Sequence, residues 1–473
     1  MANSEFYTNA STGSNLAGGS DAGSPSMTDS AGTGSWTSAT NIYVSIATNG
    51  SVAVGQFLSI YSGAATVAAY TARITAVSGG GGSAWTITLS ATAFSGAVPT
   101  TGATFKAQCG GAWLGPNAAE NFPFGFITNA LTDSAGDIPR VNLKNNTTYS
   151  ITANISLNKA GPVVFQGYTT TAGDGGKAII DGGTSGASYI LLTVAQSLLE
   201  VRDMIFQNNG ATGSSDGVNF SAFPDSTVER VIVNNVRGTG INDGNGSNRF
   251  IECEAYACNT SNTSLFGAIR INVNGFALNC IAHDNPGSIV DGFYVGGGSI
   301  VDCISDTNGR HGFQIRTFET NLHQCTSYNN ASAGIAVTTT NLLYWIQNCT
   351  LSNNGTYGVD NQKSGAVARV INCGFWSNTS GQTNGTIDAT GTITYAAAPM
   401  TDPANGDFSL KAGSGGNAAG RGAFTQTASQ YSKTSTSFPD VGAVQGTSIQ
   451  SGGTNPVGGV FIAPGGVRRS GSY

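Results

Sequence analysis

Five segments that follow one another along the chain share a single pattern. They are NCIAHDN (279–285), DCISDTN (302–308), QCTSYNN (324–330), NCTLSNN (348–354) and NCGFWSN (372–378). Their cysteines are 23, 22, 24 and 24 residues apart, and Cys253 precedes the first of them by 27 residues. Self-similarity at a fixed period indicates a repeat protein. Units this short and rich in strand-forming residues are too small for helical repeats, so they predict flat β coils stacked in parallel.

Stacking would place equivalent residues directly above one another, about 4.8 Å apart. We therefore expect a ladder of cysteines inside the stack and a ladder of asparagines at a turn, where Asn tolerates the left-handed conformation. The ladder positions are Cys280, Cys303, Cys325, Cys349, Cys373, Asn285, Asn308, Asn330, Asn354 and Asn378. In an exported protein the eight cysteines could instead form disulfides. One cysteine per coil beside apolar residues favours buried free thiols.

A second series lies about ten residues after each cysteine, in the words DGFYV (291–295), HGFQI (311–315), AGIAV (333–337) and YGVDN (357–361). The shared glycine predicts a second corner of the coil, one that needs either a positive φ or the absence of a side chain. The words DGVNF (216–220), TGIND (239–243) and FGAIRI (266–271) extend the series upstream.

Composition narrows the class of protein. Only 10% of the 473 residues are charged, the net charge is −6, and the basic residues are scattered, so the footprint of a nucleic-acid binder is missing. No apolar run reaches the ~18 residues of a membrane span. The start, MANSEFYTNASTG, has no signal-peptide pattern. A phage structural protein, assembled in the host cytoplasm and released by lysis, fits these features; non-classical secretion or a trimmed leader are alternatives.

The chain divides by composition into six predicted parts, and the β coils fill the longest of them. Residues 1–40 are a Gly/Ser-rich arm, 41–108 a small β-barrel or sandwich, and 109–137 a connector that caps the solenoid. Residues 138–395 form the coils, 396–445 a C-terminal cap and 446–473 a flexible tail. The 41–108 domain serves either for docking to a larger assembly or as a stiff spacer.

The coil region resembles the pectate-lyase-like right-handed parallel β-helix superfamily. RVNLKNNTTYSITANISL (140–157) with VVFQGY (163–168) is similar to the opening coils of such proteins, and DFSLKAGS (407–414) with FPDVGAVQ (438–445) resembles their closing segment. The resemblance covers over half of the chain and predicts an all-β right-handed solenoid. It also implies association as a homotrimer. The superfamily includes polysaccharide lyases, glycoside hydrolases, phage tailspikes and non-catalytic virion proteins, so it does not decide function.

Aligning the repeats brings two pairs of ionisable residues together. His283 and Asp306 both lie three residues after their cysteine, and Asp291 and His311 both precede the corner glycine. We expect each pair to stack on adjacent coils, where they are the candidates for general acid and base. Around them Tyr294, Phe313, Phe318, Arg316 and Glu319 are candidates for sugar contacts. Alternatively, all of these are solvated corner residues that make ion pairs between coils, because no carboxylate stacks on another carboxylate.

The patterns favour a non-enzymatic virion protein over two alternatives. It would be a capsid decoration, cement protein or spike that contacts the major capsid protein or tail proteins through its N-terminal domain and arms. The first alternative is a tailspike-like glycan depolymerase, which would act on a host-surface glycan. The second is a bacterial adhesin at the cell surface. No CxxC, GGxGxD, phosphate-binding loop or nucleophile motif is visible, so neither a metal nor a cofactor is expected.

Overall fold

The computed structural model describes seven short segments before residue 110 and most of the chain between 138 and 411. The segments are 3–8, 27–37, 41–45, 52–61, 70–79, 84–89 and 104–109, and the gaps after 138 are 147, 158–161, 196–197, 221–223, 245, 263–266 and 340–342. Nearly all described elements are strands; the 3-10 turn η1 (Pro403–Asn405) is the only helical one among them. No helix among these residues is long and apolar enough to cross a membrane.

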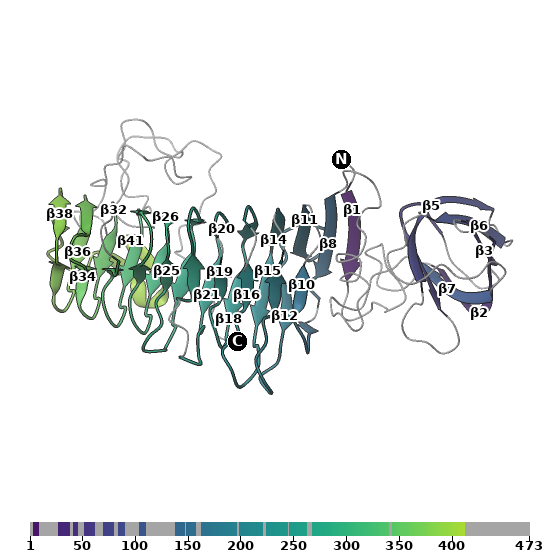
Figure 1. Ribbon diagram of the computed structural model, residues 1–473, viewed down its shortest axis with the longest axis horizontal. Helices are drawn as coiled ribbons and strands as arrows, with labels where there is room; N and C mark the ends of the chain where they lie inside the picture. Colours follow the sequence, from purple (N-terminus) through teal and green to yellow (C-terminus); the bar gives the residue numbers. More distant parts are fainter. Residues whose placement is uncertain are drawn as a thin grey trace, which may run out of the picture. The chain divides into compact units, whose positions relative to one another are not determined.

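The chain has two compact units, of which the first contains most residues up to Val231. Its coils give three runs of parallel strands (Figure 1). The first run is β1 (Asn3–Thr8), β8 (Ile138–Lys144), β11 (Val163–Tyr168), β14 (Leu199–Arg202) and β17 (Thr227–Glu229). The other runs are β9 (Thr148–Ser150), β12 (Ala178–Asp181) and β15 (Met204–Gln207), and β10 (Ile155–Leu157) with β13 (Leu192–Val194).

The second unit repeats this winding in three sheets, each named here after its first strand. The β20 sheet is β20 (Arg249–Ile251), β23 (Phe276–Leu278), β26 (Gly298–Val301), β29 (Thr320–His323), β32 (Leu343–Gln347), β35 (Val367–Ile371) and β38 (Ile387–Thr390). The β18 sheet is β18 (Ile232–Asn234), β21 (Glu254–Tyr256), β24 (Ile281–His283), β27 (Ile304–Asp306), β30 (Thr326–Tyr328), β33 (Thr350–Ser352), β36 (Gly374–Trp376) and β39 (Ile393–Thr394). The β16 sheet is β16 (Val218–Phe220), β19 (Ile241–Asp243), β22 (Ile269–Ile271), β25 (Phe293–Val295), β28 (Phe313–Ile315), β31 (Ile335–Val337), β34 (Tyr357–Asn361) and β37 (Gly381–Asn384). These stacked parallel strands confirm the predicted β-helix.

Each coil of the second unit turns at two left-handed corners. The residue before each ladder cysteine has φ between 50° and 54°: Asn279, Asp302, Gln324, Asn348 and Asn372. The residue before each ladder asparagine has φ between 50° and 56°: Asp284, Thr307, Asn329, Asn353 and Ser377. The left-handed residue is thus the neighbour of the ladder asparagine and not, as the sequence suggested, the ladder asparagine itself. Short polar side chains predominate at these corners because they tolerate this conformation best.

The corner glycines are required by space and not by φ. Gly312 does not have a positive φ, but an added Cβ would lie 2.4 Å from Ser327 Oγ and 2.6 Å from the carbonyl oxygen of Gly334 on the next coil. At Gly292 the same atom would lie 2.1 Å from Ser305 Oγ. Adjacent backbones approach too closely here for any side chain. Of the two explanations for the glycine series, the need for a residue without a side chain is therefore the one that holds.

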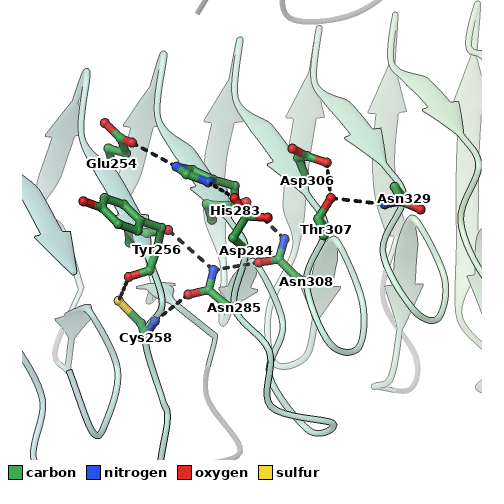
Figure 2. Close-up of polar contacts among 12 residues, drawn as sticks. Glu254, Tyr256, Cys258, His283, Asp284, Asn285, Asp306, Thr307, Asn308 and Asn329 are labelled. Carbon is green, nitrogen blue, oxygen red and sulfur yellow. Dashed lines mark hydrogen bonds and ion pairs between the residues drawn. The ribbon is translucent and has the colours of Figure 1, made fainter. Parts of the chain in front are cut away.

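The asparagine ladder joins one coil to the next through side-chain amides. Nδ2 of Asn308 donates to Oδ1 of Asn330 over 2.9 Å and to the carbonyl oxygen of Ala282 over 3.0 Å. Equivalent Nδ2–Oδ1 bonds link Asn285 to Asn308, Asn330 to Asn354 and Asn354 to Asn378, over 2.7, 3.1 and 2.9 Å. The ladder cysteines beside them are buried free thiols. Cys258 takes the place of an asparagine at the first rung, where its N–H donates to Asn285 Oδ1 (Figure 2).

Strands in the first 110 residues form a different structure. Six antiparallel strands close into a barrel: β2 (Met27–Trp36), β3 (Asn41–Ser45), β4 (Phe57–Tyr61), β5 (Tyr70–Gly79), β6 (Ala84–Leu89) and β7 (Thr104–Cys109). Both β1 and β2 fall within residues 1–40, which the sequence suggested to be an arm. Parallel pairing of β1 with β8 uses backbone groups, so it can form although this stretch has few apolar side chains. All of the predicted connector (109–137) except Cys109 lies outside the described residues, as do residues 412–445 of the predicted C-terminal cap and the whole predicted tail (446–473).

The chain turns back after the last coil. Strands β40 (Met400–Asp402) and β41 (Asp407–Leu410) form an antiparallel hairpin that lies alongside earlier coils of this unit rather than beyond β38 (Figure 1). Met400, Phe408 and Leu410 form a buried cluster with Ile304, against which Ile281 and Tyr328 also pack. The hairpin therefore covers the outward side of β24, β27 and β30.

We predict that Asn330→Ala lowers the stability of the second unit by about 2–3 kcal/mol, because unpaired buried polar groups each cost about 1–3 kcal/mol. The change removes the partner of the Asn308 amide and of the Ser305 carbonyl oxygen. Thermal or urea unfolding measures the loss. Asn321→Ala, at an exposed site on β29, serves as the control and should change stability by less than ~0.5 kcal/mol. Equal effects at the two sites would contradict the role of the ladder.

Candidate functional site

The β18 sheet presents one predicted pair of residues on its outward side. Its strand register places Tyr256 opposite His283, His283 opposite Asp306, and Asp306 opposite Tyr328. Side chains alternate along a strand, so these four point away from the coil interior that Ala282 faces. Figure 2 shows Tyr256, His283 and Asp306 on successive strands. We call Tyr256, His283, Asp306 and Tyr328 the outer column.

His283 is held between two carboxylates. Its Nδ1 lies 2.8 Å from Asp284 Oδ2, its Nε2 lies 2.9 Å from Glu254 Oε1, and its ring stacks on Tyr256 with the centroids 5.1 Å apart (Figure 2). Burial is the largest single influence and lowers the pKa of His283, but the two carboxylates together outweigh it and raise the pKa to about 9. The ring is therefore an imidazolium at neutral pH, and both of its N–H groups already have acceptors. In this arrangement it has no proton free for a substrate.

Asp306 is only 1% exposed. Its Oδ1 accepts a hydrogen bond of 2.7 Å from the Thr307 hydroxyl. The cluster of Ile304 with Met400 and Phe408 lies on the same outward side of β27, so the hairpin closes this part of the column. The structure thus brings His283 and Asp306 into register, but it does not leave Asp306 open to a bound glycan.

The second predicted pair is joined through a third residue, Arg310. The Arg310 guanidinium binds both carboxylate oxygens of Asp291, with Nε 2.8 Å from Oδ1 and Nη2 2.5 Å from Oδ2. The backbone N–H of His311 donates to Asp291 Oδ1 over 3.1 Å. Asp291 is fully buried, and this burial raises its pKa to about 6 against the opposing effect of Arg310. A carboxyl group perturbed in this way is a candidate for chemistry, but it is also what a structural ion pair produces.

His311 is neutral at physiological pH. Burial and the nearby Arg310 charge lower its pKa to about 4. Its Nδ1 accepts a hydrogen bond of 3.2 Å from the backbone N–H of Ala333, which places the ring proton on Nε2. His311 therefore contacts the backbone of the next coil.

Two arginines flank Tyr294 on the outward face of the β16 sheet. The guanidinium carbons of Arg270 and Arg316 lie 5.6 and 5.7 Å from the ring centroid, so the ring makes two cation–π contacts. Arg310 reaches Gln314 Oε1 over 3.2 Å, and Gln314 lies opposite Tyr294 in the strand register. Within the described part of the chain no carboxylate lies within ion-pair distance of Arg316. We call Arg270, Tyr294, Arg310 and Arg316 the arginine cluster.

The remaining candidates for sugar contact separate into outside and inside positions. Phe318 is 48% exposed, and Glu319 beside it is also exposed. Phe313 instead points into the coil and stacks on Phe293 with centroids 4.9 Å apart, so its predicted role as a sugar platform is wrong. The alternation along β28, which sends Gln314 outward, requires this.

Sequence reasoning missed three residues of these sites. Glu254 and Asp284 hold His283, and Arg270 covers one face of Tyr294. Glu254 directly follows Cys253, so extending the alignment by one more coil would have placed it opposite Ile281, on the same outward face as His283 and diagonal to it. Asp284 reaches the ring of the adjacent residue, His283, through a left-handed turn. The repeat pattern in the sequence does not indicate this contact.

No group of three or more His, Cys, Asp or Glu side chains that could hold a metal ion occurs among the described residues. The ladder cysteines occupy the same position on successive coils, and each of their thiols is buried and free. The described surface presents ion pairs, partly exposed guanidinium groups and aromatic rings.

The pKa of His283 predicts a pH-dependent contribution to stability. Because the folded-state pKa of about 9 lies above the ordinary value of 6.5, the stabilisation is complete below pH 6.5 and declines as the pH rises through 9. His283→Gln should therefore destabilise the protein more at pH 6 than at pH 10, as measured by urea unfolding. An equal cost at both pH values would show that the imidazolium is not stabilised by Glu254 and Asp284.

Comparison with known proteins agrees with the fold. Residues 216–375 match the family described as right handed beta helix region, and no curated protein matches the chain. The crystal structure of pectate lyase Pel9A aligns with a TM-score of 0.50 at 18% identity, covering 65% of this chain and 88% of the lyase. The mannuronan C-5 epimerase AlgE4 A-module of Azotobacter vinelandii (TM-score 0.38, 15% identity, 55% and 89% covered) and the Dettilon tailspike protein (0.36, 14%, 54% and 53%) are more distant. At this identity the likeness to pectate lyase Pel9A shows the fold alone. The chain therefore carries a right-handed parallel β-helix.

Proposed function

We propose that this chain is a non-enzymatic structural protein of a tailed-phage virion, a decoration, cement or spike protein that contacts a host-surface glycan. The non-enzymatic part of the proposal rests on one observation. The candidate acids and bases are already bound to other side chains of the protein. His283 has a carboxylate at each ring nitrogen, and Asp291 has a two-point contact with Arg310. A general acid or base must reach the proton that it transfers, and these groups face protein partners.

The arginine cluster supports contact with a glycan. Arg270 and Arg316 are partly exposed, and their charges lie on either side of the buried Tyr294 ring. Guanidinium groups recognise carboxylate, phosphate and sulfate through paired hydrogen bonds. Phe318 is exposed and offers an apolar surface in the segment after β28, which also contains Arg316. An acidic surface polysaccharide presents the matching chemistry.

The virion location is supported by composition. A chain with few charges and a surface of neutral polar residues suits a rod that stays extended and inert in a particle. Docking to capsid or tail proteins through the N-terminal barrel strands and the arms, and assembly as a homotrimer, belong to the same proposal.

Binding to acidic capsular polysaccharide or lipopolysaccharide tests the glycan contact. Replacing Arg270 and Arg316 by Ala should weaken binding at least about tenfold, because each charge-assisted hydrogen bond contributes about 1.5–3 kcal/mol. Arg369→Ala, on the outward face of the β20 sheet, is the matched control and should bind normally. Equal binding by the double variant and the wild type, across both kinds of glycan, would exclude this surface.

The copy number in particles tests the virion location. Quantifying the chain against the major capsid protein in purified particles should give a fixed ratio. A ratio near one would indicate a decoration or cement protein, and a few copies per particle would indicate a spike. Its absence from particles would rule out the virion proposal and favour an adhesin.

One observation favours a depolymerase as the second candidate. Asp291 contacts Arg310 of the arginine cluster and is a carboxyl group whose pKa is raised to about 6, so its protonation changes near neutral pH. Following the chain length of the bound glycan over time separates the two functions. We expect no shortening. Shortening by the wild type that disappears in Asp291→Asn would replace the structural proposal with a glycan-cleaving one.

A further inference from the structure

The hairpin β40–β41 is complete in itself. Every hydrogen bond of the described residues 400–411 stays within the hairpin or reaches Pro399 just before it. The Thr401 hydroxyl binds the Ser409 carbonyl oxygen, and the N–H of Lys411 donates to the carbonyl oxygen of Pro399 over 2.7 Å. The tight turn closes at Gly406, whose φ is 83°. None of these bonds would be lost if the hairpin moved away from the coils as one body.

Its attachment to the coils consists of apolar side chains alone. Met400, Phe408 and Leu410 are 2–5% exposed and pack on Ile304, Ile281 and Tyr328. The Phe408 ring meets Tyr328 edge-on, with centroids 5.9 Å apart. Apolar contacts are not directional, so separation exposes surface without leaving a buried polar group unpaired.

The segment that connects the hairpin to the last coil is short, and packing holds its first end in place. Tyr395 lies against Gly374, where an added Cβ would come within 2.2 Å of the Tyr395 hydroxyl, and its N–H donates to Phe375 over 2.9 Å. Four residues, AAAP (396–399), then lead to Met400. Ala396 and Ala397 are exposed, so they can change conformation without disturbing packed neighbours.

We propose that the hairpin is a strap that opens as a unit about residues 396–399 and so controls access to the outer column of the β18 sheet. Closed, it holds Ile304 and Asp306 at 2% and 1% exposure. Open, it uncovers Ile281, Ile304 and Tyr328 on three successive coils, and with them Asp306, which lies on the same outward side of β27 as Ile304. The coils keep their own hydrogen bonds in both states, because the ladders that join them lie inside the stack or at its corners and not under the strap.

Hydroxyl-radical footprinting of the full chain tests the strap. Phe408→Ser weakens only its apolar attachment, and Ala404→Ser in the exposed turn of the hairpin is the matched control. We expect labelling of Tyr328 and Met400 to rise at least about tenfold in Phe408→Ser, since each 1.4 kcal/mol of lost packing raises the open population tenfold. Tyr344, fully buried inside the coils, should label as slowly as in the wild type.

Two results would overturn the proposal. Unchanged labelling of Tyr328 and Met400 would mean that the hairpin does not open, and a parallel rise at Tyr344 would mean that the coils unfold together with it. If Phe408→Ser fails to fold, amide hydrogen exchange of the wild type decides. Amides of the hairpin should then exchange at least about tenfold faster than those of β24, β27 and β30. Exchange at the same rate in both would equally contradict a separate strap.

Discussion

The side-chain amide of the ladder asparagine is the contact on which the second unit depends. From Asn285 to Asn354 its Nδ2 reaches both the carbonyl oxygen of the coil before and the Oδ1 of the asparagine after it, and at Asn378 it reaches the Leu351 carbonyl oxygen. An amide is suited to this because it carries both donors and acceptors, so one residue type satisfies every rung. The turn that delivers each asparagine needs a left-handed residue just before it. The asparagine ladder, the left-handed turn before each asparagine and the length of each coil therefore depend on one another.

This constraint also determines where ionisable residues can go. With the interior filled by apolar side chains and thiols, charges are left on the outward positions, where register alone decides their neighbours. His283 and Asp291 became buried there by pairing with carboxylates and with Arg310. Pairing lowers the cost of burial but removes free acid–base groups. The partly exposed guanidinium groups of Arg270 and Arg316 are what remains for an outside partner, which is why we propose recognition rather than catalysis.

The spacing of Cys280 to Cys373 was sufficient to predict the fold, because a fixed period together with alternation specifies stacked strands. The same alignment placed His283 opposite Asp306. It could not show that the hairpin after the last coil folds back over them, since Met400 and Phe408 stand outside the repeat and carry no period. It also assigned the left-handed corner to the ladder asparagine and not to the residue before it, and it placed the Phe313 side chain on the outside of the coil. Both errors concern single-residue geometry, which a repeat of 22 to 27 residues leaves open.

An experimental density map of residues 279–378 at side-chain resolution tests the central claim most directly. The account predicts a continuous chain of amide contacts from Asn285 to Asn378, with His283 and Asp306 on the outside of adjacent coils. A slip of one residue in any coil would turn that coil's outward side chains inward. Such a slip, or asparagines that point to solvent, would contradict the ladder as the basis of the fold and of both outward sites.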